Sequence, residues 1–200
     1  MARKALSDEQ IEHMRKCFCD TAYELYRSAD YDAVTMRAIA KSIGCSPMMA
    51  YRYFENKEEV FAQLRARLFH QLADALEAAP RGDTPLDHLE SMGKAYIDYA
   101  QDNPDAYRLL YMVPLKNGTH SEETDRAQKR TSKSLLDATQ RVIAAGQLHG
   151  DPVVLAHSLW ASIHGLISLH LSNQLTQGAS FKQLVPQVLQ RLIHQHTPAN

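Results

Sequence analysis

The sequence predicts an all-α protein, because helix-start signals recur along its 200 residues while strand signals are missing. No Asn-Gly turn lies between alternating apolar residues, and the β-branched residues do not cluster. Four helices are expected to begin at a proline that follows a capping residue, since the first residue of a helix does not need its amide hydrogen. These prolines are Pro47, Pro85, Pro104 and Pro152.

Capping residues and glycines mark the expected helix boundaries. N-caps are predicted at Ser7, Thr35, Ser46, Asn56, Thr84, Asn103 and Asp151. Gly44 and Gly146 are expected in the left-handed conformation that ends a helix. The predicted helices, nine in all, span residues 7–28, 35–43, 46–53, 56–79, 85–102, 104–112, 120–145, 152–173 and 181–195. Because no repeat or flexible linker interrupts the chain, we expect a domain of residues 1–57 joined directly to a domain of residues 58–200.

Composition limits the possible functions. A hydrophobic content of 44% with 22% charged residues is ordinary for a soluble globular protein. The net charge of −1 gives no overall attraction to nucleic acid or to acidic membranes, so any site for a polyanion must be local. Cys17, Cys19 and Cys45 match neither a common zinc spacing nor a disulfide framework, which predicts reduced thiols in a cytoplasmic protein. The first ten residues also lack the apolar stretch of a secretory signal.

One stretch challenges the expectation of a soluble protein. Residues 152–181 contain no Asp, Glu, Lys or Arg, and the segment is long enough to cross a bilayer. However, three histidines and three serines fall within nineteen of these residues, and no basic cluster flanks them. We therefore expect a helix that protein buries on nearly all sides, and no membrane partner.

The segment VTMRAIAKSIGCSPMMAYRYF predicts two short helices joined by Gly-Cys-Ser, the arrangement of a helix-turn-helix unit. On a helical wheel Ala50 and Phe54 share one side, while Met48 and Arg52 point roughly opposite. Residues 35–57 hold four basic residues and one acidic residue, a net charge of +3. In a major groove methionine can contact thymine methyls, and arginine can bind guanine or phosphate. An ordinary core helix would instead need these methionines as gap-fillers.

The order T-x-R-x-I-A-x-x-I-G-x-S-x-x-x-x-Y-x-Y-F-x-N-K-E-E-V, from Thr35 to Val60, resembles the N-terminal domain of the TetR family of bacterial transcription regulators. The resemblance implies a three-helix DNA-binding domain followed by a helical domain for ligand binding and dimerisation. It implies phosphate contacts by Thr35 and Arg37. Base edges would face Pro47, Met48, Met49 and Arg52, and the DNA backbone would be held by Tyr51, Tyr53 and Lys57. The family often has histidine where this chain has Tyr53, and a phenol can also donate to phosphate.

Two DNA-binding domains related by a twofold axis can read two half-sites of DNA together, so the C-terminal helical domain is expected to dimerise. A helix that is apolar on all sides needs to be buried by more protein than one small helical domain provides. In the predicted last helix, apolar residues recur along one stripe. The resemblance agrees, since the family commonly dimerises through its final two long helices. The predicted interface residues are Leu159, Ile163, Leu166, Leu184, Val188 and Leu192.

Phenols and methionines gather in residues 85–112, where they predict either a core or a mostly apolar ligand pocket. In the charge-free helix, Trp160, His164 and Gly165 resemble the signature of the Trp-His-Gly class of TetR C-terminal domains. The family resemblance implies that a small-molecule effector binds in this C-terminal domain. The candidate pocket residues are His88, Met92, Tyr96, Tyr99, Tyr107, Tyr111, Trp160 and His164. For Trp160 and His164 the alternative of a stacked structural pair stays open.

The sequence offers no catalytic pattern. It has no H-E-x-x-H, G-x-S-x-G or phosphate-binding loop, and three histidines of the charge-free helix are seven and six residues apart, unlike a helical metal pair. We therefore predict no enzyme and no cofactor or metal. The expected function is a bacterial, homodimeric transcription repressor that binds a pseudo-palindromic DNA operator and is released by an unidentified effector. Two alternatives stay open: a small all-α metal-binding or enzymatic bundle, and a non-specific architectural DNA-binding protein.

Overall fold

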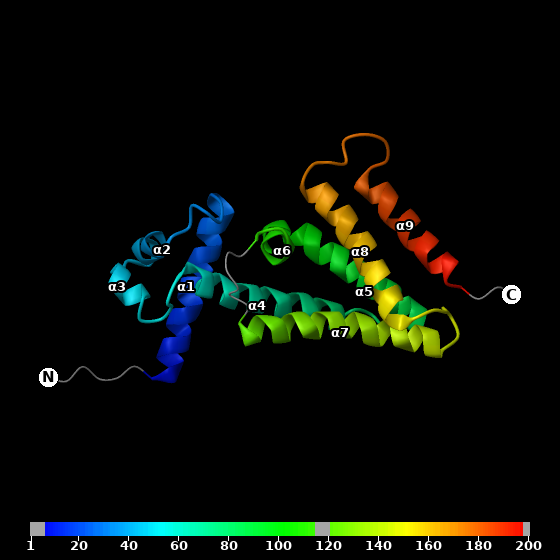
Figure 1. The fold of residues 1–200 in the computed structure, drawn as a ribbon, viewed down its shortest axis with the longest axis horizontal. Coiled ribbons are helices and arrows are strands. Elements are labelled where there is room, and N and C mark those ends of the chain that lie inside the picture. The colour runs from blue at the N-terminus through cyan, green and yellow to red at the C-terminus, as the bar shows by residue number, and fades with distance from the viewer. Residues whose placement is uncertain (1–6, 115–120, 198–200) are drawn as a thin grey trace. The chain divides into compact units, whose positions relative to one another are not determined.

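The computed structural model describes residues 7–114 and 121–197, and in these two ranges it contains helices and no strand. This confirms the predicted all-α fold (Figure 1). The helices are α1 (Asp8–Ser28), α2 (Met36–Ile43), α3 (Pro47–Ala50), α4 (Lys57–Glu77), α5 (Pro85–Asp102), α6 (Pro104–Tyr111), α7 (Glu122–Ala144), α8 (Pro152–Leu171) and α9 (Phe181–Gln195). Each predicted helix is present, although the start predicted at residue 120 lies outside the described residues.

Side chains cap the helices largely as predicted. Ser7 and Thr84 form capping boxes at α1 and α5. Amide hydrogens in the first turns of α2, α3, α4 and α8 are accepted by Thr35, Ser46, Asn56 and Asp151. Asn103 stands at the predicted N-cap position of α6, and its carbonyl accepts the Tyr107 amide at 3.0 Å. Its side chain does not cap α6, because the side-chain amide donates to the Tyr99 carbonyl at 3.1 Å and closes the end of α5.

The chain divides into two compact units. The first contains the residues up to Phe69 together with Arg108–Gln128, and the second contains His70–Tyr107 and the residues from Lys129 onward. This division falls inside α4, whereas the predicted domain boundary after residue 57 lies at the start of that helix. The sequence-based boundary therefore stays a prediction.

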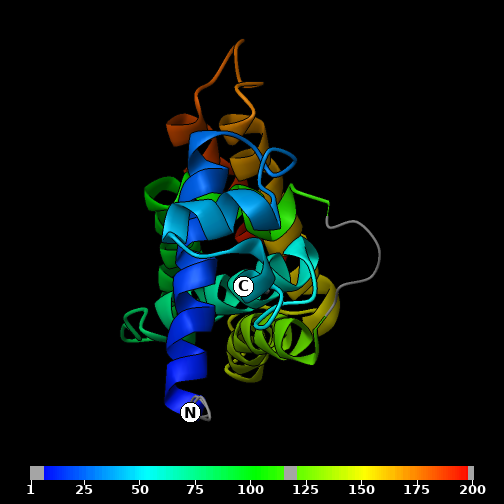
Figure 2. The same cartoon turned by 90° about the vertical axis from the view of Figure 1, so that its left-hand side faces the viewer.

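The first unit is built around aromatic and aliphatic side chains from α1, α2 and α4. Phe18 of α1, Ile39 of α2 and Phe61 of α4 are completely buried. α1 packs on α2, and Figure 2 shows α2 lying across α1. The Phe18 ring meets the Phe54 ring edge to face, with centroids 5.9 Å apart. This core supports α3, which has too few residues to be stable as an isolated helix.

The second unit is centred on α8, which packs against α5 and α9. Figure 1 shows α8 and α9 side by side. A stripe of α8 is buried, and it consists of Leu155, Ala156, Leu159, Ile163 and Ile167. Elsewhere in this unit Arg130 of α7 holds the end of α4, with Nε 2.9 Å from Glu77 Oε1 and Nη2 2.7 Å from Asp74 Oδ1.

The expectation that protein buries α8 on nearly all sides is wrong for the single chain. Only 28% of its apolar 18-residue window is buried, because its neighbours cover one face. Val154 is 63% exposed and Leu169 40% exposed. Among the described residues α8 is the one helix whose length and composition would allow a membrane span, but core helices of soluble proteins meet the same criteria.

Candidate functional site

The turn between α2 and α3 follows from Gly44 and Ser46. Gly44 has φ 80°, which a glycine adopts without strain, and the Cys45 amide donates back to the Ala40 carbonyl at 2.9 Å. The Ser46 hydroxyl then accepts the Met49 amide at 3.3 Å and starts α3. Residues 51–53 continue as a turn, since the Tyr53 amide bonds to the Ala50 carbonyl at 3.0 Å. The helix predicted over 46–53 is thus shorter, but the helix-turn-helix unit is present.

The two sides of α3 differ in exposure as the helical wheel predicts. Ala50 and Phe54 are buried at 0% and 1% exposure, and they attach the element to the core. The opposite side forms a surface that we call the recognition surface, in which Met49 is half-buried and the other four residues are exposed: Pro47, Met48, Met49, Tyr51 and Arg52. Met48 is the most open of these large apolar residues, with 76% of its surface exposed. An apolar side chain this exposed gains nothing from the protein's own core and is available to a partner.

Thr35 and Arg37 lie at the start of α2 and are both exposed. The Thr35 hydroxyl accepts the Ala38 amide at 3.1 Å, and a hydroxyl in that role can still donate its own hydrogen. Arg37 and the exposed Lys41 lie one turn apart on α2, so their positive charges fall on the same side of the helix.

Tyr53 and Lys57 have contacts inside the protein that the sequence pattern did not show. Tyr53 is only 6% exposed, and its ring centroid lies 5.6 Å from that of Phe18. The Lys57 ammonium lies 2.9 Å from the Tyr31 carbonyl oxygen and 4.1 Å from the centroid of the Tyr31 ring. An ammonium has three hydrogens, so this carbonyl contact leaves Lys57 able to bind phosphate. Tyr53 is mainly a packing residue, and its phosphate contact stays a prediction.

Sequence reasoning missed Arg15, which bonds to residues on both sides of the loop between α3 and α4. Its guanidinium contacts Glu59 and Gln63 of α4 and the carbonyl of Tyr53. Arg15 precedes Cys19 by four residues and so continues the buried stripe of α1. A basic residue at helical spacing from an apolar stripe was the signal that could have identified it.

In the second unit, four of the predicted pocket residues form a hydrogen-bonded aromatic network: Tyr96, Tyr107, Trp160 and His164. Trp160 Nε1 donates to the Tyr96 hydroxyl at 3.2 Å, and the two tyrosine hydroxyls lie 3.0 Å apart. The Tyr107 hydroxyl is 2.6 Å from His164 Nδ1. The Trp160 and His164 rings stack, with centroids 5.3 Å apart. Burial lowers the pKa of His164, which favours the neutral imidazole in this network.

The remaining pocket candidates have different surroundings. His88, Met92 and Tyr99 are buried on α5. Burial lowers the pKa of His88, and the positive charges of Arg141 and Arg81 lower it further. Tyr111 belongs to the first unit, where its ring meets Phe69 edge to face at 5.7 Å. The division between the units falls within α6, so Tyr107 is assigned to the second unit and Tyr111 to the first.

The predicted dimer residues also separate into two groups. Leu159 and Ile163 are 4% and 7% exposed, so they face the interior of their own chain rather than a partner. The half-buried members of the set are Leu166, Leu184, Val188 and Leu192. Exposed large apolar side chains on α8 that the predicted interface did not include are Val153, Val154, Trp160 and Leu169.

The three cysteines are free thiols. Cys19 is buried, with its sulfur 3.7 Å from the Val60 carbonyl oxygen, and burial raises the pKa of its thiol to about 12. A thiol with that pKa stays protonated near neutrality and is a poor nucleophile. Across residues 7–114 and 121–197, no group of three His, Cys, Asp or Glu side chains could hold a metal ion.

Two family descriptions match this chain. Residues 18–64 match "Bacterial regulatory proteins, tetR family", and residues 89–193 match "Tetracyclin repressor-like, C-terminal domain". The HTH-type transcriptional regulator Rv1816 of Mycobacterium tuberculosis is 27% identical over 173 residues, covering 70% of this chain and 73% of that protein. The HTH-type transcriptional regulator YobS of Bacillus subtilis is 26% identical over 183 residues, covering 80% and 93%.

Solved structures share the arrangement of helices. SCO4313, described as a regulatory protein, superposes with a TM-score of 0.79 at 26% identity, covering 95% of this chain and all of that one. A tetR-family regulatory protein from Rhodococcus RHA1 superposes with a TM-score of 0.71 at 19% identity, covering 93% and 98%, which shows the common fold. Since the family descriptions span both the helix-turn-helix unit and most of the helical body, the chain belongs to the TetR family and is a DNA-binding transcription regulator.

Proposed function

We propose that the protein is a cytoplasmic repressor that binds a pseudo-palindromic operator as a homodimer and leaves it when a small-molecule effector binds. The observation that carries this proposal is the recognition surface. It presents an exposed methionine and arginine on a helix-turn-helix unit within a segment of net charge +3. Repression, dimerisation and an effector are also typical of the TetR family.

The DNA contacts divide into two kinds. Thr35, Arg37, Tyr51 and Lys57 hold phosphate oxygens, with a smaller contribution from the hydroxyl of Tyr53. Base edges are read by Pro47, Met48, Met49 and Arg52. The methionines offer apolar contact, which suits thymine methyl groups, and the Arg52 guanidinium suits guanine O6 and N7.

The incomplete burial of α8 supports the proposed dimerisation. Val154 and Leu169 are exposed in the single chain, and a second copy of α8 and α9 would bury them. The half-buried residues Leu166, Leu184, Val188 and Leu192 complete this interface. Two linked DNA-binding domains on half-sites one helical turn apart would bind DNA far more tightly than a single domain would.

The aromatic network is the proposed polar part of an effector pocket. Two phenols, an indole N–H and an imidazole whose pKa is lowered by burial converge here, and the Trp160 side chain at 37% exposure gives the network access to solvent. Aromatic surface with a few converging polar groups is the composition of a ligand site. His88, Met92 and Tyr99 of α5 would supply further pocket surface. An effector that binds the DNA-incompetent state more tightly weakens DNA binding by the same factor. No catalytic residue, cofactor or membrane partner is part of this proposal.

The test is selection of bound duplexes from a random pool by the purified protein. We expect enrichment of a sequence with twofold symmetry, and binding that weakens steeply as salt increases. Equal affinity for all duplexes would instead support an architectural DNA-binding protein, and a tightly bound metal would support a metal-binding bundle. With the operator in hand, small molecules can be screened for release of the labelled duplex, and Tyr96→Phe serves to locate a hit in the network.

A further inference from the structure

Arg15 of α1 uses all three guanidinium nitrogens. Nε lies 3.1 Å from Gln63 Oε1, Nη2 lies 2.9 Å from Glu59 Oε1, and Nη1 donates to the backbone carbonyl of Tyr53. The guanidinium carbon also lies 4.2 Å from the centroid of the Phe54 ring. One side chain thus joins α1, the first turns of α4 and the residues that directly follow the recognition surface.

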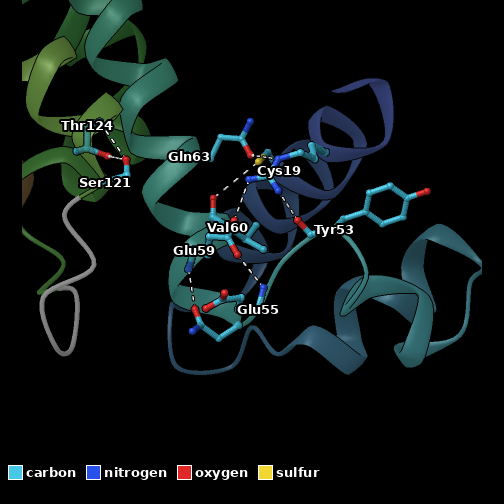
Figure 3. Close-up of polar contacts among 10 residues, drawn as sticks. Cys19, Tyr53, Glu55, Glu59, Val60, Gln63, Ser121 and Thr124 are labelled. Carbon is cyan, nitrogen blue, oxygen red and sulfur yellow. Dashed lines mark hydrogen bonds and ion pairs between the residues drawn. The ribbon is translucent and has the colours of Figure 1, made fainter. Parts of the chain in front are cut away.

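Glu59 completes the connection from the other side. One carboxylate oxygen accepts from Arg15, and the other accepts the backbone amide of Glu55 at 2.7 Å. The Glu59 amide donates to the Asn56 side chain at 2.8 Å. Figure 3 shows Glu59 beside Glu55, and the Tyr53 ring pointing away from them while its carbonyl is joined to the cluster by a dashed line. The loop from residue 53 to residue 56 is therefore bonded to its neighbours at several points.

The recognition element needs such support. α3 has four residues, and beyond Ala50 the chain continues only as a turn. A helix this short does not define its own direction. The buried side chains of Ala50 and Phe54 attach one side of the recognition element to the core. Rotation about this attachment is restricted by the hydrogen bonds of the Tyr53 carbonyl and the Glu55 amide. Those two backbone groups bond to Arg15 and Glu59.

We propose that Arg15 and Glu59 are positioning residues that set the angle at which the recognition surface meets the bases. This inference depends on the proposed function, in which that surface reads an operator. Neither side chain needs to touch DNA in this role. They favour the bound orientation before DNA arrives, so the binding energy of specific contacts is not spent on ordering the loop.

Charge makes the proposal testable, because a positioning role and a simple Coulomb effect have opposite signs at Glu59. Glu59→Gln removes a negative charge from a DNA-binding domain, which by attraction alone strengthens binding to a polyanion. Arg15 and the Glu55 amide bond to different carboxylate oxygens, however, and glutamine replaces one of those oxygens by an NH2 group that cannot accept, so one of these bonds is lost. A positioning role therefore predicts weaker operator binding.

The experiment compares operator duplex with a scrambled duplex for the full-length wild type, Arg15→Lys and Glu59→Gln. Arg15→Lys keeps the positive charge but an ammonium cannot hold three acceptors in the fork geometry. We expect each variant to lose about tenfold in operator affinity, a coupling typical of residues in one hydrogen-bond network. Affinity for the scrambled duplex should be unchanged for Arg15→Lys and no weaker for Glu59→Gln. The double variant should lose less than the product of the two single losses.

Glu24 and Arg27 of α1 provide a matched control pair. They form an exposed ion pair at 3.2 Å, so Glu24→Gln and Arg27→Lys make the same chemical changes away from the loop. Their ratio of operator to scrambled affinity should equal that of the wild type. Glu59→Asp is a second variant that keeps the charge but shortens the side chain, and it should also lower the ratio. Far-ultraviolet circular dichroism with a melting midpoint checks that each variant is folded.

Wild-type operator preference in the Arg15 and Glu59 variants would overturn the assignment, as would tighter operator binding by Glu59→Gln. Parallel losses for both duplexes would also overturn it, because a merely structural role lowers the folded fraction and affects both equally. A wild-type protein with no operator preference would overturn the proposed function itself, and the positioning role with it. A result in which the wild type prefers the operator and the variants keep that preference therefore refutes the positioning role alone, without refuting the proposed function.

Discussion

The hydroxyl of Tyr107 lies 2.6 Å from Nδ1 of His164, and this contact joins α6 to α8 inside the second unit. The same hydroxyl is 3.0 Å from the hydroxyl of Tyr96, and the Tyr107 side chain is completely buried. A single oxygen atom therefore connects three helices. Replacing Tyr107 by phenylalanine removes only this oxygen, so the side-chain volume changes little while both hydrogen bonds are lost. A single substitution can therefore test the network.

Tyr107→Phe should lower the free energy of unfolding by about 1–3 kcal/mol, since one buried and one partly buried hydrogen bond are lost at about 0.5–1.5 kcal/mol each. Urea denaturation followed by circular dichroism measures this change. Tyr51→Phe is the control, because Tyr51 is 55% exposed and its hydroxyl should contribute little to stability. Equal stability of the two variants would contradict the buried network.

The pH dependence of stability should include a contribution from His164. Burial holds the pKa of His164 below its usual 6.5, so the folded protein binds fewer protons than the unfolded chain as the pH drops through that value. Stability from this group is present above the unfolded pKa and decreases as the pH falls towards the folded pKa. Melting midpoints between pH 8 and pH 5 should therefore fall less for His164→Gln than for the wild type.

The control for that measurement is His157→Gln, because His157 is an exposed histidine on the same helix. The difference between the two variants isolates the effect of the buried position. His88, whose pKa burial also lowers, contributes with the same sign and is present in both variants. An unchanged profile in His164→Gln would show that His164 does not titrate differently in the folded protein.

Arg37→Ala should weaken binding to operator and scrambled duplexes alike, and reduce the slope of log affinity against log salt by about 0.9, the value for one phosphate contact. Because Arg37 is exposed on α2, its replacement should leave the core undisturbed. Lys94→Ala removes a positive charge from α5 and should leave the slope unchanged. A slope equal to that of the wild type would remove Arg37 from the phosphate contacts.

Met48 should read a thymine methyl group. Replacing thymine by deoxyuridine at the contacted position deletes that methyl, and the wild type should lose about 0.8 kcal/mol of binding free energy, the value for one buried methyl-sized group. Met48→Ala should be insensitive to the same replacement, because the contacting side chain is absent. Fluorescence anisotropy with matched duplexes measures the cycle. If both proteins respond equally to every thymine replaced, Met48 does not make this contact.

Val154→Glu should convert the proposed homodimer to a monomer, because a carboxylate would be buried without a partner in an apolar interface. Val154 is 63% exposed in the single chain, so the substitution should leave the melting behaviour of the folded chain largely intact. Sedimentation velocity gives the oligomeric state. Ile11→Glu on α1, at a position 37% exposed, is the control and should remain dimeric. A dimeric Val154→Glu would place the interface elsewhere.

Local signals account for most of what was predicted correctly. The Ser46 cap, Pro47 at the first helical position and Gly44 in the left-handed conformation determine the helix-turn-helix with information contained in a few consecutive residues. The exposure of Met48 opposite Ala50 follows from helical periodicity alone. Where local signals competed, as at Asn103 between two helices, the predicted helix start is correct but the side-chain contact is not, because the side chain could bond to either helix and bonds to the preceding one.

The sequence by itself determined the helical content, the starts of most helices and the face that α3 exposes, because capping, proline placement and periodicity act over a few residues. Tertiary structure alone decided which side chains meet. It brought Arg15 to Tyr53 across 38 residues and Tyr107 to His164 across 57, and it placed Leu159 and Ile163 in the core of their own chain. These outcomes depend on how helices far apart in the chain pack together, and no local pattern encodes that packing.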